Sequence, residues 1–117
     1  MGLVKVYMYL KKVLVKRFMA SKLYLYQAEI KNKVLGAKVT GCDWIEGSLM
    51  IDDCVYLVSK LKDIGFDYVC VSSGGILPVT NLVFKPSYQI HLSKEIKDRV
   101  GILTKTAGMI TTKNQID

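Results

Sequence analysis

The spacing of apolar residues predicts two amphipathic helices that alternate with short apolar strands. The clearest helical pattern begins after Gly47 and Ser48. Its inward positions recur every three or four residues, at Ile51, Cys54, Val55, Val58, Leu61 and Ile64. Acidic residues stand in its first turn and lysines in its last turn, as the helix macrodipole favours, and Gly65 is a natural end. A second helix is predicted over residues 88–99, with Leu92, Ile96 and Val100 inward and Gly101 as its stop.

Three short segments, 37–42, 66–71 and 102–106, have the composition of buried strands. The central one stops abruptly in two serines and two glycines, residues 72–75, as a strand does when it leaves a sheet and opens into a loop. The resulting order, strand–helix–strand–helix–strand, predicts a parallel α/β sheet with right-handed crossovers. Because three parallel strands leave two unpaired edges, we expect an internal part of a larger α/β protein.

Two further helices are predicted nearer the start of the sequence, over residues 3–18 and 20–34. The first is a basic amphipathic pattern with apolar groups at Leu3, Tyr7, Leu10, Leu14 and Phe18. It is compatible with a membrane-surface or targeting helix, with an outer helix of a larger fold, or with unselected sequence ahead of the domain. A start at Met19 would remove it. We therefore divide the chain into a basic helical segment, 1–35, and an α/β part, 36–117.

The net charge of +7 belongs entirely to this first segment. Residues 1–35 hold eight Lys/Arg and one acid, whereas residues 36–117 hold nine basic and nine acidic residues. A neutral α/β part argues against nucleic acid as its partner. No apolar run approaches the roughly 20 residues of a membrane-spanning helix. Three widely spaced cysteines, Cys42, Cys54 and Cys70, fit reduced thiols of a cytoplasmic protein, two of them in the core.

Few side chains suggest chemistry by themselves. Lys38 interrupts a short apolar strand, which fits either an edge strand with the lysine in solvent or a lysine that meets an anionic ligand in a polar cavity. Asp52 and Asp53 diverge by about 100° around a helix, so they suit the helix dipole better than shared acid–base work. His91, the only histidine, is expected on the surface. No catalytic or metal-binding set is predicted.

Several short motifs nevertheless occur in one recognisable order. They are DWIEG (43–47), FDYVCVSSGG (66–75), PSYQ (86–89), GILT (101–104) and AGMIT (107–111). Together they resemble the NADH:flavin oxidoreductase, or old yellow enzyme, family, and most closely its bacterial ene-reductase branch. The resemblance covers about residues 36–116. It implies a partial (β/α)₈ TIM barrel of about three βα units, the fifth to the seventh, whereas a complete barrel needs about 250 residues.

The resemblance also implies a cofactor, FMN, with NAD(P)H as co-substrate. Lys38 matches the family's arginine beside the flavin ring, where a cation stabilises the reduced flavin. Gly108 matches the strand end whose backbone approaches the FMN phosphate. Lys105 and Leu103 depart from the pattern, which has a small residue and a proline there. The family's substrate-binding histidines, proton-donor tyrosine and Gly-Arg phosphate clamp have no counterpart.

These residues lead to two functional hypotheses. The first is a fragment of an FMN-dependent NAD(P)H oxidoreductase that is inactive alone and pairs with a second chain supplying the missing barrel strands. The second is a small non-catalytic interaction protein that uses its basic amphipathic N-terminal helix, with a membrane surface as one partner.

Overall fold

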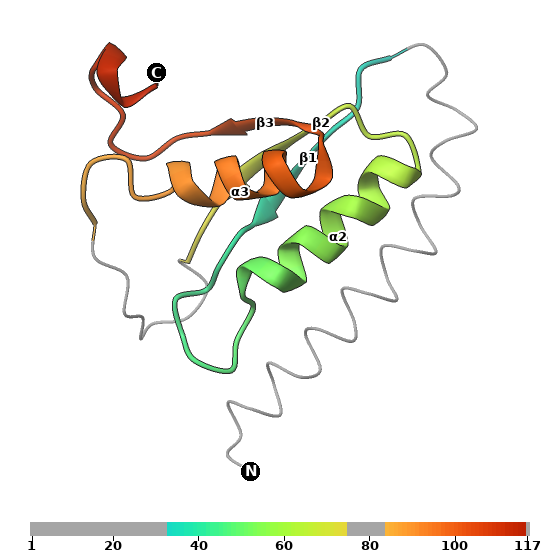
Figure 1. The fold of residues 1–117 in the computed structure, drawn as a ribbon, viewed down its shortest axis with the longest axis horizontal. Helices are drawn as coiled ribbons and strands as arrows, with labels where there is room; N and C mark the ends of the chain where they lie inside the picture. Colours follow the sequence, from blue (N-terminus) through green and yellow to red (C-terminus); the bar gives the residue numbers. More distant parts are fainter. Residues whose placement is uncertain (1–32, 75–83, 117) are drawn as a thin grey trace.

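The computed structural model describes residues 33–74 and 84–116. Its strands are β1 (Gly36–Thr40), β2 (Tyr68–Ser72) and β3 (Leu103–Thr106). Helix α2 (Ile51–Asp63) connects β1 to β2, helix α3 (Ile90–Val100) connects β2 to β3, and a short 3₁₀ helix, η1 (Lys113–Gln115), follows (Figure 1). The strands form one parallel sheet in the order β1-β2-β3. The predicted α/β order and parallel pairing are therefore confirmed.

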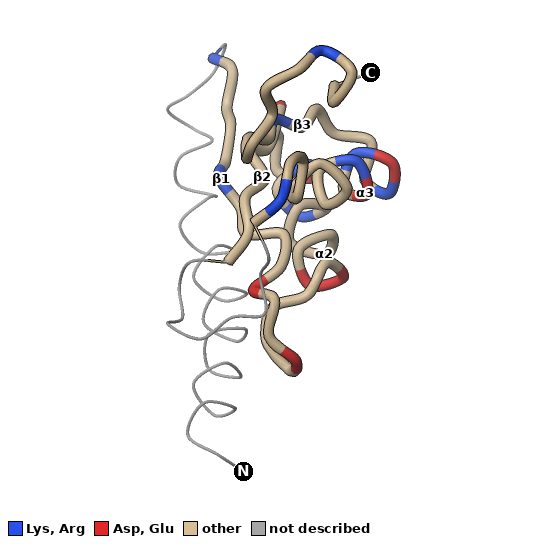
Figure 2. Tube along the Cα trace, turned by 90° about the vertical axis from the view of Figure 1, so that its left-hand side faces the viewer, with Lys and Arg blue, Asp and Glu red and all other residues tan. Residues whose placement is uncertain are grey.

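Both helices cover the same face of this sheet. Seen from the side, the strands form one layer and α2 and α3 form the other (Figure 2). A consecutive strand order with crossovers of one hand produces this arrangement, because each helix returns over the same side. Within residues 33–74 and 84–116, no helix is long and apolar enough to cross a lipid bilayer.

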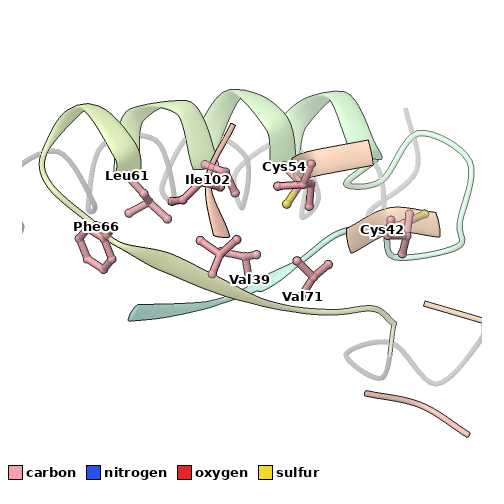
Figure 3. Packing of buried hydrophobic residues seen from close by; sticks show 11 residues of the cluster. Val39, Cys42, Cys54, Leu61, Phe66, Val71 and Ile102 are labelled. Carbon is pink, nitrogen blue, oxygen red and sulfur yellow. The ribbon is translucent and has the colours of Figure 1, made fainter. Parts of the chain in front are cut away.

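The core lies between this sheet face and the two helices (Figure 3). Val39 and Val71 are register partners on β1 and β2, and both are buried. Val58 of α2 and Ile96 of α3, from the predicted inward stripes, have no exposed surface. Burial of such side chains contributes about 1.5–3 kcal/mol each, which holds the layers together.

Both helices end at the glycines that were predicted to stop them, Gly65 and Gly101. The backbone N–H of Gly101 donates to the carbonyl of Lys97 at 2.8 Å, and Gly101 has a left-handed φ of 68°. Gly65 follows α2 with a φ of 97°. Helix α3 begins at Ile90 and not at residue 88, because residues 86–89 form a turn in which Ser87 has a φ of 64°. That backbone cannot continue a right-handed helix.

The strands are shorter than predicted. β1 ends at Thr40, after which Cys42 turns into the core and the N–H of Asp43 donates to Leu49 O at 2.9 Å. β2 begins at Tyr68 and not at residue 66, because the N–H of Phe66 still donates to Leu61 O of α2 at 3.0 Å. Apolar residues are buried both within the hydrogen-bonded strands and in the segments next to them. Apolarity in the sequence therefore predicts strands that are longer than the paired ones.

The predicted basic helix over 3–18, with its proposed membrane role, lies outside the described residues, and so does the second predicted helix, 20–34, up to residue 32. The last two positions of the second one, Lys33 and Val34, are described and are not helical. The chain is already entering the sheet there. The N–H of Leu35 donates to Asp67 Oδ2 at 2.7 Å, and its carbonyl accepts from the Asp67 N–H at 2.9 Å.

Candidate functional site

The second face of the sheet is covered by neither α2 nor α3. We call it the open face; it consists of the strand residues Gly36, Lys38, Thr40, Tyr68, Cys70, Ser72, Leu103 and Lys105. Across its middle, Lys38, Cys70 and Lys105 are register partners on three successive strands. We call these three residues the basic row. Neighbouring strands lie about 4.8 Å apart, so the two lysines are separated by roughly 10 Å.

The two lysines of the basic row carry unneutralised charge. Both are exposed, whereas Cys70 between them is half-buried. In the described part of the chain, neither ammonium group has a carboxylate within ion-pair distance. None of the three strands contains an acidic residue. Lys38 is thus exposed on an edge strand of the described sheet.

Beside the basic row the open face is apolar. Gly36, Tyr68 and Leu103 are register partners one pleat away, toward the amino ends of the strands. A Cβ on Gly36 would meet the Tyr68 ring at 2.1 Å, so the ring lies directly over that glycine. The Leu103 side chain is 70% exposed. The face therefore combines two exposed lysines with an apolar strip, Gly36, Tyr68 and Leu103, in which Leu103 is exposed and Tyr68 half-buried.

At the carboxyl ends of the strands, Gln89 ties two strand exits together. The Ser73 hydroxyl, after β2, donates to Gln89 Oε1 at 2.8 Å, and Gln89 Nε2 donates to the carbonyl of Ala107, after β3, at 2.6 Å. Gln89 is 5% exposed. Sequence analysis placed this residue in a motif without giving it a role. The sequence offered one signal of this role, a polar side chain next to an apolar helix face. A buried amide needs hydrogen-bond partners for both its oxygen and its nitrogen.

Gly108 lies two residues beyond the end of β3, in the exit from the strand. Its φ is 119°, and a Cβ there would meet Tyr88 Cε1 at 2.6 Å and Gln89 Nε2 at 2.9 Å. The chain's own side chains fill the space that a phosphate cradle would need on that side. Close packing against Tyr88 and Gln89 is sufficient to require glycine here.

The DWIEG block forms a loop held by buried polar groups. The Ser48 hydroxyl donates to Asp43 Oδ2 at 2.7 Å, and both residues are buried. Trp44 has a φ of 60°, and its ring meets that of His91 edge-on, with centroids 5.8 Å apart. His91 is exposed, as predicted. This loop connects β1 to α2, and the hydrogen bond from Ser48 gives Asp43 a structural role.

The three cysteines are free thiols, and Cys42 and Cys54 are buried, as predicted for core residues. Burial, and secondarily the charge of Asp53, raise the pKa of Cys54 to about 12. Its thiol is therefore protonated and unreactive at neutral pH. Cys70, on the open face, is the accessible thiol of the three.

The adjacent carboxylates of α2 have separate structural partners. Asp53 Oδ2 accepts the N–H of Met50 at 3.1 Å and so caps the helix, while Asp52 Oδ1 accepts from Arg99 of α3 at 2.7 Å. Their predicted divergence is confirmed. Among the described residues, no group of three His, Cys, Asp or Glu side chains could hold a metal ion. No protein-family model matches the sequence.

Proposed function

We propose that this chain is a sector of an FMN-dependent NAD(P)H oxidoreductase of the ene-reductase type, and that it does not transfer hydride on its own. This proposal is supported by three successive parallel strands with both connecting helices on one face, an arrangement that consecutive strands and helices of a (β/α)₈ barrel would also have. In that arrangement the open face is the inner wall of the barrel. The family is proposed from the order of the sequence motifs. The architecture alone would not suffice, because it is common to many functions.

The position of Lys38 is the observation that carries the proposal. It lies on the open face and not under the helices, and its ammonium group is exposed. In a completed barrel this charge would point toward the interior, where FMN, when bound, supplies the hydride-transfer chemistry. Lys38 would hold positive charge beside the ring. It cannot reproduce the two-pronged hydrogen bonding of an arginine.

The strand end at Gly108, which would hold the FMN phosphate, fits the cofactor less well. For this reason we do not propose that the chain binds FMN by itself. Tyr88 and Gln89 occupy the space beside Gly108. Within the described sheet, β1 and β3 are both edge strands, so each offers a row of backbone groups to a further strand. We therefore propose that FMN is held only when a second chain pairs with these edges and supplies the remaining strands.

Titration with FMN tests both halves of this proposal. The purified chain alone should leave flavin fluorescence unchanged, whereas a preparation co-expressed with the remaining strands of an ene-reductase barrel should quench it. Lys38→Ala should weaken that quenching by about tenfold, as expected for one charge-assisted contact. Lys94→Ala, which removes an exposed charge on α3, is the matched control and should have no effect.

Two results would count against the proposal in different ways. Tight stoichiometric quenching by the chain alone would refute the need for a second chain. Failure of the co-expressed complex to quench, although the two chains copurify, would refute the flavin assignment.

A further inference from the structure

We propose that the open face is a docking surface for an acidic segment of another protein, with the basic row as its recognition element. This goes beyond the flavin proposal, because it depends only on the sheet face and not on redox chemistry. An acidic segment seated there would cover Lys38, so it and a flavin would exclude one another.

The first argument is that most basic side chains of the helical layer have acidic partners, whereas those of the open face have none in the described part of the chain. On the helical layer, Lys60, Lys94 and Arg99 lie beside acids, whereas Lys62 donates to Val100 O and Lys97 has no ion pair among the described residues. The ion pairs are Arg99–Asp52, Arg99–Glu95, Lys60–Asp63 and Lys94–Asp98. On the open face, by contrast, Lys38 and Lys105 have no acid in the described part of the chain. An acidic partner would supply the complementary charge.

The second argument is the apolar strip beside the basic row. Leu103 is largely exposed, and Tyr68 lies flat over Gly36. Parallel sheets are normally covered on both faces, so this surface resembles half of a protein–protein contact. Nucleic acid is less suited to it. Two cations would neutralise about two phosphates and give only a weak, strongly salt-dependent contact, while the apolar strip would remain uncovered.

Charge also argues against a second copy of this chain as the occupant of the open face. A second copy docked face to face would bring lysines against lysines. The fitting partner is a different chain whose contact segment is acidic.

The spacing of the basic row defines the partner's pattern. Two acidic side chains about 10 Å apart would meet both lysines. Positions seven residues apart along an α-helix satisfy this, since the rise is about 1.5 Å per residue. Apolar residues on the same helix face, between and beside the two acids, would then cover Cys70 and the apolar strip.

A designed peptide tests this pattern directly. The probe is a fluorescein-labelled 15-residue helix with two glutamates seven residues apart on an otherwise apolar face. Matched versions carry glutamine or lysine at those two positions. By fluorescence anisotropy, the full chain should bind the glutamate peptide at least tenfold more tightly than the glutamine peptide. The same peptide should slow the reaction of Cys70 with a thiol reagent, a readout that needs no variant.

Charge reversal assigns the binding to the basic row. The double variant Lys38→Glu/Lys105→Glu should lose the glutamate peptide and bind the lysine peptide instead. Lys38→Gln/Lys105→Gln should bind neither charged peptide preferentially. The control Lys60→Glu/Lys94→Glu makes the same change of charge on the helical layer, and its affinity should stay within twofold of the original.

Three results would overturn the proposal. The first is equal affinity for the glutamate and glutamine peptides. The second is an equal loss of binding in the Lys60/Lys94 control, which would show general electrostatics. The third is tighter binding of a single-stranded oligonucleotide that is lost in the Lys38/Lys105 variant, which would assign the face to nucleic acid. FMN appears in none of these measurements, so this proposal and the flavin proposal can fail separately.

Discussion

Replacing Gly108 by alanine should destabilise the fold strongly, and the size of the effect follows from the local geometry. The new Cβ would lie 2.6 Å from Tyr88 Cε1 and 2.9 Å from Gln89 Nε2. Real Cβ atoms do not approach other heavy atoms so closely, so the Tyr88 ring or the strand exit must move. The φ of 119° adds a strained backbone for any residue with a side chain.

Gly47 provides a matched control for the backbone contribution. It also has a positive φ, 75°, but a Cβ there meets nothing within 4 Å. Gly47→Ala should therefore lower the free energy of unfolding by about 1 kcal/mol, from backbone strain alone. Gly108→Ala adds overpacking, which typically costs 1–3 kcal/mol, so its loss should be about 3 kcal/mol. The difference of about 2 kcal/mol measures the crowding at Gly108.

Urea unfolding followed by the fluorescence of Trp44, the only tryptophan, measures these losses. With a urea m-value of about 1 kcal/mol/M, the midpoints of the two variants should differ by roughly 2 M. Tyr88→Ala in the Gly108→Ala background should recover most of the crowding penalty in a double-mutant cycle. Equal losses for the two glycine variants, or no recovery with Tyr88→Ala, would refute the packing explanation.

Further predictions concern the thiols, the core and the strand exits. At pH 8, Ellman's reagent should modify Cys70 first. The pKa of about 12 leaves roughly 10⁻⁴ of the Cys54 thiol ionised at that pH. Labelling of Cys54 before the protein unfolds would contradict its burial. Ile96→Ala should lower the free energy of unfolding by about 2–5 kcal/mol in urea, whereas Arg99→Ala, which breaks exposed ion pairs, should cost under about 1 kcal/mol. Gln89→Leu should cost about 1–3 kcal/mol by removing two part-buried hydrogen bonds, and its hydrogen exchange should increase at both strand exits, but not in α2.

The order of elements was predictable because each signal is local. Gly65 and Gly101 end helices through their own backbone freedom, and the inward stripes of α2 and α3 follow from helical periodicity. Strand ends were less accurate. Phe66 is as apolar as a strand residue, yet it still bonds to the helix before it, and only the three-dimensional path of the chain distinguishes the two cases.

The candidate site was harder to predict because it depends on register and on distant neighbours. Sequence analysis singled out Lys38 and Lys105 separately, but their alignment through Cys70 requires the pairing of three strands. Gln89 contacts residues 16 and 18 positions away, beyond any local pattern. At Gly108, a phosphate cradle and a crowded turn demand the same residue, and only the neighbouring side chains distinguish them.

The composition of the open face bears on what can cover it. In a doubly wound sheet, a second layer of helices packs on such a face, and its strand residues are then apolar. Here the middle of the face holds Lys38, Cys70 and Lys105, with the hydroxyls of Thr40 and Ser72 one pleat farther on. Burying two unpaired lysines under an apolar helix would cost several kcal/mol each. A cavity that holds an anionic ligand, or a partner that brings its own acids, avoids that cost, and for this reason both proposals place negative charge against the basic row.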